Sequence, residues 1–262
     1  MARTAAAGSE VTVPGPLRGA AVRRDWSRLC SPTVKPALFQ SDMVAGLPEP
    51  ARRWLTHAIR PGTPLARSVE LRMYGHIRLG AWRPFTAIQV LAPPQGFIWT
   101  ATARVFGLPV SGYDRFSSGT GQMRWRLLGL PVVTADGPDV TTSAAGRLAA
   151  EGVLIPTSFG AATWTTTGSD QVTATWRIGD HEESVDLQIG AHGQLRRVLI
   201  QRWGNPNRSP YGRYPFGVTI GAEDTFAGIT IPSEFRAGWW WGTDRQDEGE
   251  FFRAHITDAM FR

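Results

Sequence analysis

The chain has 262 residues, of which 42% are hydrophobic and 19% charged. This is the composition of a globular protein with a large core, and it excludes an intrinsically disordered chain. The formal net charge is +6, yet Lys35 is the only lysine, and the arginines are spread along the sequence. The densest group, Arg196, Arg197 and Arg202, alternates with apolar residues and is interpreted as a solvated strand face. No clustered basic surface for a nucleic-acid partner is therefore predicted.

Cysteine content and hydropathy point to a cytoplasmic protein. Cys30 is the only cysteine, which excludes an intramolecular disulfide and a cysteine-based metal site. The N-terminal region has no apolar stretch long enough for the core of a signal peptide. The longest charge-free window, 84–103, is interrupted by Pro93 and Pro94 and cannot cross a bilayer as a helix. We expect a cytoplasmic location and no integral membrane segment.

The pattern divides the chain into an arm and one domain. Residues 1–42 mix Ala, Gly, Pro, Ser and Arg without a period, which predicts a flexible N-terminal arm. Its apolar residues leave open a second interpretation, in which the arm folds over the mouth of a pocket. These residues are Val11, Val13, Leu17, Val22, Trp26 and Leu29. Residues 43–262 are predicted to form a single β-domain.

Apolar and polar residues alternate along most of this domain, as expected for half-buried strands. Strands are predicted at 68–79, 86–91, 96–106, 110–116, 122–128, 162–167, 172–178, 184–189, 195–203, 218–226 and 229–235. Helices are predicted at 47–59 and 141–154, where Pro residues and small caps bound the apolar stripes. The loop 204–215 is a candidate lid because of its length. The predicted fold is mainly β with two helices: a curled antiparallel sheet of roughly ten strands that forms a barrel or half-barrel, with one helix before it and one inserted midway.

The last thirty residues form a hairpin of two aromatic-rich runs around a polar tip. Side chains of a strand alternate between its faces, so Trp239 and Trp241 are expected on one side and Trp240 on the other. Parity alone does not say which side faces a pocket. The polar tip belongs at the rim of the sheet, where Asp244 and Arg245 could meet the polar end of a ligand.

Aromatic residues are abundant, with 11 Trp and 12 Phe. They could simply fill a β-core, or they could line a ligand pocket. As pocket residues we consider Trp99, Trp125, Trp239 and Trp241. His76 and His255 lie on long predicted strands and could point into the same cavity or into solvent. The histidines are too dispersed for a metal site, and no cofactor motif is present, so no metal and no cofactor are expected.

Two carboxylates could carry chemistry. Glu151 shares a helical face with Leu148 and Ile155, where an apolar environment would raise its pKa and suit it to general acid or base catalysis. A structural ion pair with an arginine is the alternative. Asp114 lies inside a predicted strand and could belong to a buried pair or orient a ligand.

Several segments together resemble an uncharacterised protein family that is common in actinobacteria. They are 47–55, 82–87, 126–132, 147–157, Gly238-Trp239-Trp240-Trp241-Gly242-Thr243 and 249–254. The resemblance covers about residues 44–262. It implies a fold similar to the periplasmic lipoprotein carriers, a half-barrel whose concave apolar face holds acyl chains. It supplies no catalytic residues.

Two functions follow as hypotheses. The first is binding of an elongated hydrophobic small molecule or lipid in an aromatic-lined cavity. The second is a cofactor-independent cyclase or isomerase of natural-product biosynthesis, which would act on a polyketide- or terpenoid-like intermediate with Glu151 and Asp114 as catalytic residues. The sequence does not specify whether the protein is an enzyme, nor its oligomeric state.

Overall fold

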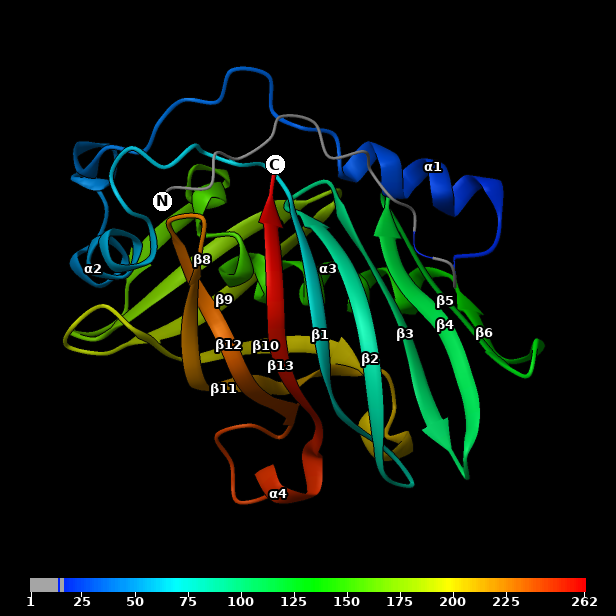
Figure 1. The fold of residues 1–262 in the computed structure, drawn as a ribbon. Helices are drawn as coiled ribbons and strands as arrows, with labels where there is room; N and C mark the ends of the chain where they lie inside the picture. The colour runs from blue at the N-terminus through cyan, green and yellow to red at the C-terminus, as the bar shows by residue number, and fades with distance from the viewer. Residues whose placement is uncertain (1–13, 15–16) are drawn as a thin grey trace.

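The protein is built on one antiparallel sheet, seen here in a computed structural model that describes Pro14 and residues 17–262. The sheet has 13 strands in the order β6-β5-β4-β3-β2-β1-β13-β12-β11-β10-β9-β8-β7 and curls into a half-barrel (Figure 1). The strands are β1 (Val69–Leu79), β2 (Ala81–Ala92), β3 (Gly96–Val105), β4 (Leu108–Ser117), β5 (Thr120–Leu127), β6 (Leu130–Asp136), β7 (Ala162–Thr166), β8 (Gln171–Ile178), β9 (His181–Ile189), β10 (Leu195–Gly204), β11 (Gly212–Phe226), β12 (Ile229–Trp239) and β13 (Glu250–Phe261). The predicted fold class, a mainly β chain with a curled antiparallel sheet, is confirmed.

The sheet consists of two meanders that meet in its middle. The first runs from β1 to β6 and the second from β7 to β13, and β1 pairs with β13 to join them. As a result, β6 and β7 are consecutive in sequence but lie at opposite edges of the sheet. The segment between them must therefore cross from one edge to the other.

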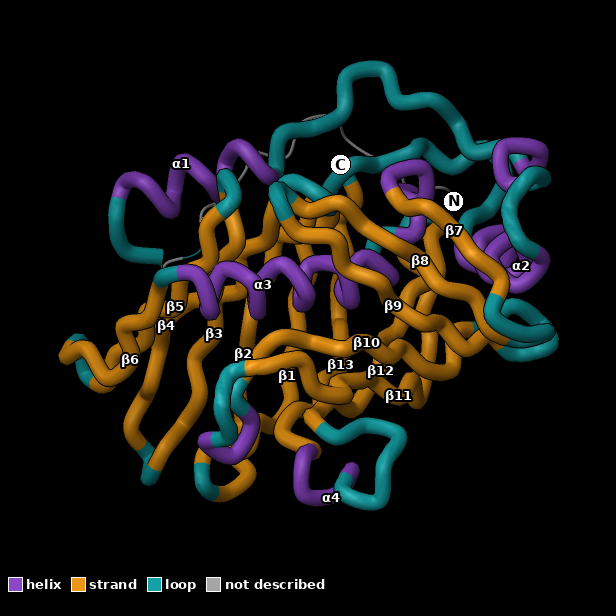
Figure 2. The backbone as a smooth tube through the Cα atoms, turned by 180° about the vertical axis from the view of Figure 1, so that it is seen from behind, coloured by secondary structure: helices purple, strands orange, loops and turns teal. Residues whose placement is uncertain are grey.

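That crossing is made by α3 (Pro138–Glu151), which lies over the concave side of the sheet (Figure 2). The helix contacts β4, β5 and β6 on one side and β8, β9 and β10 on the other. Its 14 residues span about 21 Å at the α-helical rise. Pro138 occupies the first turn, where its missing N–H is not needed. The helix thus spans the open side of the half-barrel from one meander to the other and leaves a space between itself and the sheet.

The end of α3 is fixed by a close contact that requires glycine. A Cβ atom on Gly152 would lie 2.8 Å from Cζ2 of Trp176, closer than a real Cβ can approach a carbon. Gly152 begins the short 3-10 turn Gly152–Leu154, and a second turn, Pro156–Ala161, leads into β7. The remaining helices are α1 (Ala20–Leu29), α2 (Glu49–Ala58) and α4 (Gln246–Gly249), with further 3-10 turns at Ser41–Val44 and Pro206–Arg208.

Two details of the sheet differ from the prediction. The sheet has thirteen strands instead of roughly ten, and β6 was missed because Leu130, Val132 and Val133 are exposed on an edge strand and do not alternate with polar residues. The predicted loop 204–215 is shorter than expected because β11 begins at Gly212. This part of the predicted lid belongs to the sheet, because its residues pair with β10. Within it, Arg213 forms a bidentate ion pair with Glu183, at 2.8 and 2.9 Å.

The described part of the N-terminal arm contains a helix that packs on the convex side of the sheet. Residues of α1 and its flanks form a second small core with outward-facing residues of β2 and β3 (Figure 1). This core consists of Leu17, Val22, Trp26, Leu29, Cys30, Val90, Ala92 and Ile98. Amphipathic α1 thus covers an apolar outer patch and does not fold over a pocket mouth. Val11 and Val13 lie outside the described residues.

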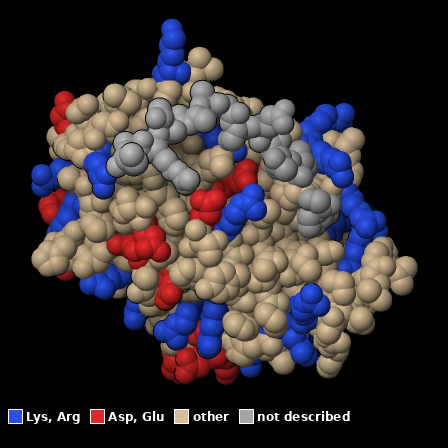
Figure 3. Space-filling model, viewed as in Figure 1, with Lys and Arg blue, Asp and Glu red and all other residues tan. Residues whose placement is uncertain are grey.

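The surface outside this core carries mixed charge. On the face seen in Figure 3, basic and acidic side chains lie among a larger area of uncharged residues. Among the described residues, no helix combines the length and apolar character needed to span a bilayer.

Candidate functional site

A cavity of about 590 Å³ lies between α3 and the concave face of the sheet. This volume is in the range of sites that bind drug-sized ligands, roughly 300–1,000 Å³. Its lining is mostly apolar and comes from both meanders. Representative lining residues are Met73, Ile77, Phe85, Trp99, Ala101, Val198, Phe216, Ile220, Phe235, Trp239 and Phe252.

Aromatic rings in contact form much of the cavity wall. Phe85 stacks on Phe252 with ring centroids 5.0 Å apart, and Trp99 lies 5.8 Å from Phe85. Trp125 continues this wall at 5.6 Å from Trp99. Such pairs are worth about 0.5–1.5 kcal/mol beyond the area they bury. The wall is therefore a rigid apolar surface rather than a set of independent side chains.

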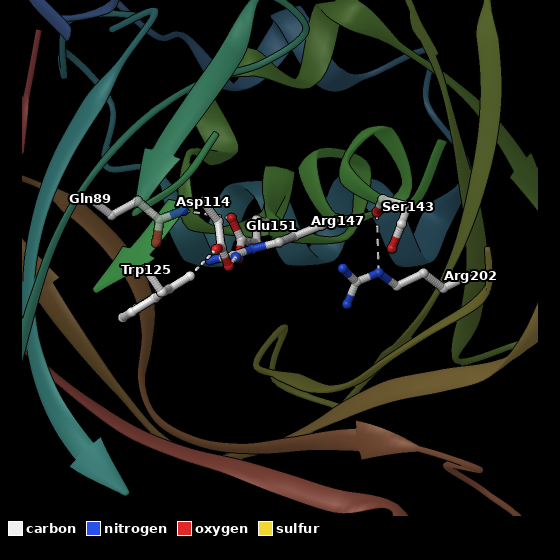
Figure 4. Close-up of polar contacts among 7 residues, drawn as sticks. All are labelled: Gln89, Asp114, Trp125, Ser143, Arg147, Glu151 and Arg202. Carbon is white, nitrogen blue, oxygen red and sulfur yellow. Dashed lines mark hydrogen bonds and ion pairs between the residues drawn. The ribbon is translucent and has the colours of Figure 1, made fainter. Parts of the chain in front are cut away.

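A polar cluster interrupts this wall under the C-terminal half of α3 (Figure 4). Arg147 donates from Nε to Glu151 Oε1 at 2.7 Å and from Nη1 to Asp114 Oδ2 at 3.1 Å. The second oxygen of each carboxylate is also engaged: Trp125 Nε1 donates to Asp114 Oδ1 at 2.8 Å, and Gln89 Nε2 donates to Glu151 Oε2 at 2.5 Å. Every oxygen of the two carboxylates therefore has a donor.

The protonation of this cluster depends on burial and charge. Burial raises the pKa of Asp114 above its ordinary value, although the Arg147 charge and the Trp125 hydrogen bond oppose the shift. Burial by itself would lower the pKa of Arg147, but the charges of Glu151 and Asp114 outweigh it, so the pKa is raised. Arg147 is accordingly a fixed cation held between two acids.

Arg202 of β10 is the second arginine of the cavity and is placed differently. Its Nε donates to the backbone oxygen of Ser143 at 3.2 Å, and Figure 4 shows its terminal nitrogens on the side that faces the Arg147 cluster, with no dashed contact to it. Its guanidinium carbon lies 4.7 Å from the ring centroid of Phe216 and 5.4 Å from that of Trp239. Burial, followed by the like charge of Arg147, lowers the pKa of Arg202 to about 10. It stays cationic at neutral pH.

Five of the sequence-predicted residues line this cavity: Trp99, Trp125, Trp239, Asp114 and Glu151. Glu151 was considered as a general acid or base or as a member of a structural ion pair, and the structure contains the ion pair, with Arg147. Asp114 belongs to a buried pair with the same arginine. Sequence reasoning missed Gln89 and Arg147, and it placed Arg202 on a solvated face. Arg202 has the same strand parity as the buried Val198 and Ile200, which was the available signal that it points inward.

Trp241 does not line the cavity, contrary to the parity argument. Trp240 has a positive φ of 58°, which ends the regular alternation of β12. Trp241 is instead buried on the outer side of β11, where a Cβ on Gly217 would lie 2.6 Å from its Cδ1. Its indole N–H donates to Thr219 Oγ1 at 3.0 Å. Its role is packing on the convex face.

The predicted histidines and the hairpin tip also lie outside the cavity. His76 and His255 face a separate groove on the convex side, and His255 Nδ1 lies 3.2 Å from Glu234 Oε1. Asp244 and Arg245 are exposed in the loop after β12, where Arg245 pairs with Glu248 at 2.8 Å and lies over Trp240. None of these four residues belongs to the cavity lining. Within the described ranges, no three His, Cys, Asp or Glu side chains are arranged to hold a metal ion.

Comparisons with known proteins identify similar solved structures and the family. Two solved structures are similar at 10% sequence identity each. A domain named for outer membrane lipoprotein sorting, from Vibrio parahaemolyticus, has a TM-score of 0.41 over 74% of this chain and 85% of that chain. A LolA superfamily protein from Nitrosomonas europaea has a TM-score of 0.44 over 81% of this chain and 92% of that chain. The search of curated proteins finds no match.

Residues 37–251 match the profile of a family of unknown function, DUF6544. The match covers most of the chain, including the whole of α3 and twelve complete strands, and reaches the first residues of β13. The resemblance to an uncharacterised family, drawn from the sequence, is thereby confirmed. The chain belongs to the family of unknown function DUF6544.

Proposed function

We propose that the protein binds an elongated hydrophobic small molecule or lipid in the cavity beneath α3. The observation that carries this proposal is the apolar, aromatic lining of a cavity of about 590 Å³. Water in such a cavity finds few hydrogen-bond partners, and covering apolar surface yields about 25 cal/mol per Å². An apolar ligand that displaces this water is therefore favoured.

The cavity also has an opening to solvent. Leu79 at the β1–β2 turn and Val132 and Val133 of β6 line the cavity and are 44%, 52% and 40% exposed, respectively. From this rim the lining continues to Ile220 and Pro232 on the opposite wall. A ligand that reaches from the rim to that wall would be elongated.

Catalysis as a cyclase or isomerase finds less support in this geometry. A general acid or base needs a carboxyl oxygen that is free to reach the substrate. Both oxygens of Asp114 and of Glu151 already accept hydrogen bonds from Arg147, Trp125 or Gln89. The binding function is accordingly the one we propose.

A titration with 1-dodecanol tests the proposal, with tryptophan fluorescence as the readout because Trp99, Trp125 and Trp239 line the cavity. The wild type should show saturable binding. Val218→Trp should weaken it, because Val218 lines the cavity and a larger ring there would occupy part of the ligand's space. Arg197→Trp is the matched control on an exposed position of β10 and should bind normally. Absence of wild-type binding to every probe with a dodecyl chain, or equal affinity in Val218→Trp, would refute the proposal.

A further inference from the structure

The two arginines in the cavity differ in how their charge is balanced. Arg147 has two carboxylates as partners, at 2.7 and 3.1 Å. Among the residues that the structure describes, no carboxylate lies within ion-pair distance of Arg202. Within the described ranges, Arg202 makes a single hydrogen bond, from its Nε to the carbonyl oxygen of Ser143. A guanidinium has five N–H donors, so most of the donors of Arg202 remain available.

The protein's own acids near Arg202 are already committed. Glu183 is held by Arg213 through two ion-pair hydrogen bonds, and Asp139 accepts a hydrogen bond from Trp203 Nε1 at 2.9 Å. Asp114 and Glu151 are held by Arg147. Glu183, Asp114 and Glu151 could pair with Arg202 only by giving up an ion pair with another arginine. The charges of Glu151, Asp114 and Glu183 act on Arg202 at longer range, but none of them forms an ion pair with it. The fold thus keeps a cation without a direct ionic partner in a mostly apolar cavity, where an anion that reached its free N–H groups would be stabilised.

The surroundings of Arg202 also define how an anion would approach it. The rings of Phe216 and Trp239 lie against the guanidinium group and hold it by cation–π contacts. Nε is taken by the helix backbone, which leaves the edge formed by Nη1 and Nη2. Arg202 lines the cavity, and Figure 4 shows this edge at the end of the side chain that extends from β10 toward the Arg147 cluster. Two parallel N–H groups in this arrangement match the two oxygens of a carboxylate or a phosphate.

We infer that the ligand is an amphipathic anion: an apolar chain along the aromatic wall, with a terminal carboxylate or phosphate group bound by Arg202. This inference rests on the proposed function and deepens it, because it defines the class of ligand. The lowered pKa of Arg202, about 10, still leaves the side chain charged at neutral pH. A neutral head group could accept the same hydrogen bonds but would leave the charge uncompensated.

The test compares ligands with one chain and different heads at pH 7.5: dodecanoate, dodecyl phosphate and 1-dodecanol. The two anions are titrated below their critical micelle concentrations and the alcohol below its solubility limit. Wild-type protein should bind at least one of the anions ten-fold or more tightly than the alcohol. The anion that binds more tightly identifies the head group as a carboxylate or a phosphate. Equal affinity for all three probes would overturn the inference and leave hydrophobic binding intact. Failure of all three to bind would overturn the proposed function and the inference together.

Variants of Arg202 provide the second measurement. Arg202→Met keeps an unbranched stem but removes the guanidinium group and its charge, and it should lower the ratio of anion affinity to 1-dodecanol affinity at least ten-fold. Arg202→Lys restores the charge without the paired N–H groups and should give an intermediate affinity. Arg197→Met, an exposed position on the same strand, is the control and should change nothing. An Arg202→Met variant that still prefers the anion by the wild-type factor would contradict the assignment.

Discussion

Replacing Arg147 by methionine should destabilise the protein more than any surface ion-pair variant. The side chains of Arg147, Asp114 and Glu151 are 17%, 17% and 22% exposed, so removal of the cation leaves two nearly buried carboxylates without their ion-pair partner. Breaking one partner of a buried pair usually costs 3–5 kcal/mol. Since the cavity admits some water, we expect about 3 kcal/mol. For a domain of this size, that corresponds to a decrease in Tm of roughly 6–12 °C.

Urea unfolding of wild type and Arg147→Met measures this loss as a change in midpoint at constant slope. Arg124→Met is the matched control, because Arg124 pairs with Asp136, whose side chain is 62% exposed, and such pairs contribute about 0–1 kcal/mol. The triple variant Arg147→Met, Asp114→Asn, Glu151→Gln removes the orphaned charges and should regain most of the lost stability. A loss below about 1 kcal/mol in Arg147→Met, or a triple variant as unstable as the single one, would refute the reasoning.

Three further outcomes are expected. Trp26→Ala should reduce the free energy of unfolding by about 3–5 kcal/mol, because Trp26 is fully buried between α1 and the convex face. The affinity for 1-dodecanol should stay unchanged. A loss of affinity would show that α1 also shapes the cavity. Gly152→Ala should cost about 1–3 kcal/mol, since its Cβ would lie 2.8 Å from the Trp176 ring, and a neutral result in urea unfolding would disprove this close contact. Burial raises the pKa of Asp114 above 3.8, so its proton stabilises the folded state fully below pH 3.8 and less as pH rises through the folded pKa. The difference in unfolding free energy between wild type and Asp114→Asn should therefore shift against the wild type as pH increases, and a pH-independent difference would contradict the raised pKa.

The fold class followed from the sequence because alternation of apolar and polar residues is a local property. Strands such as β1 and β9 keep that alternation over most of their length, and turn residues separate them. The edge strand β6 does not, since one of its residues is Pro131 and most of its side chains are exposed. The position of α1 on the convex face depends on outward-facing apolar residues of β2 and β3, which no local pattern pairs with the arm.

The sequence predicted an aromatic-lined cavity but identified only some of the residues that line it. Trp99, Trp125 and Trp239 lie within β3, β5 and β12, and all three line the cavity. Trp241 follows the positive φ of Trp240, a backbone feature that the run of three tryptophans does not reveal. Arg202 was placed in solvent because a charged residue in a strand is usually exposed. Only the crossing of α3 over the sheet shows that this face is enclosed.

Native mass spectrometry of the protein purified from its own host tests ligand binding most directly. The wild type should carry a co-purifying amphiphile in a one-to-one complex, and Val218→Trp, with its cavity narrowed, should be purified with less of it. A wild-type protein that is free of ligand and binds none of the dodecyl probes would contradict the account.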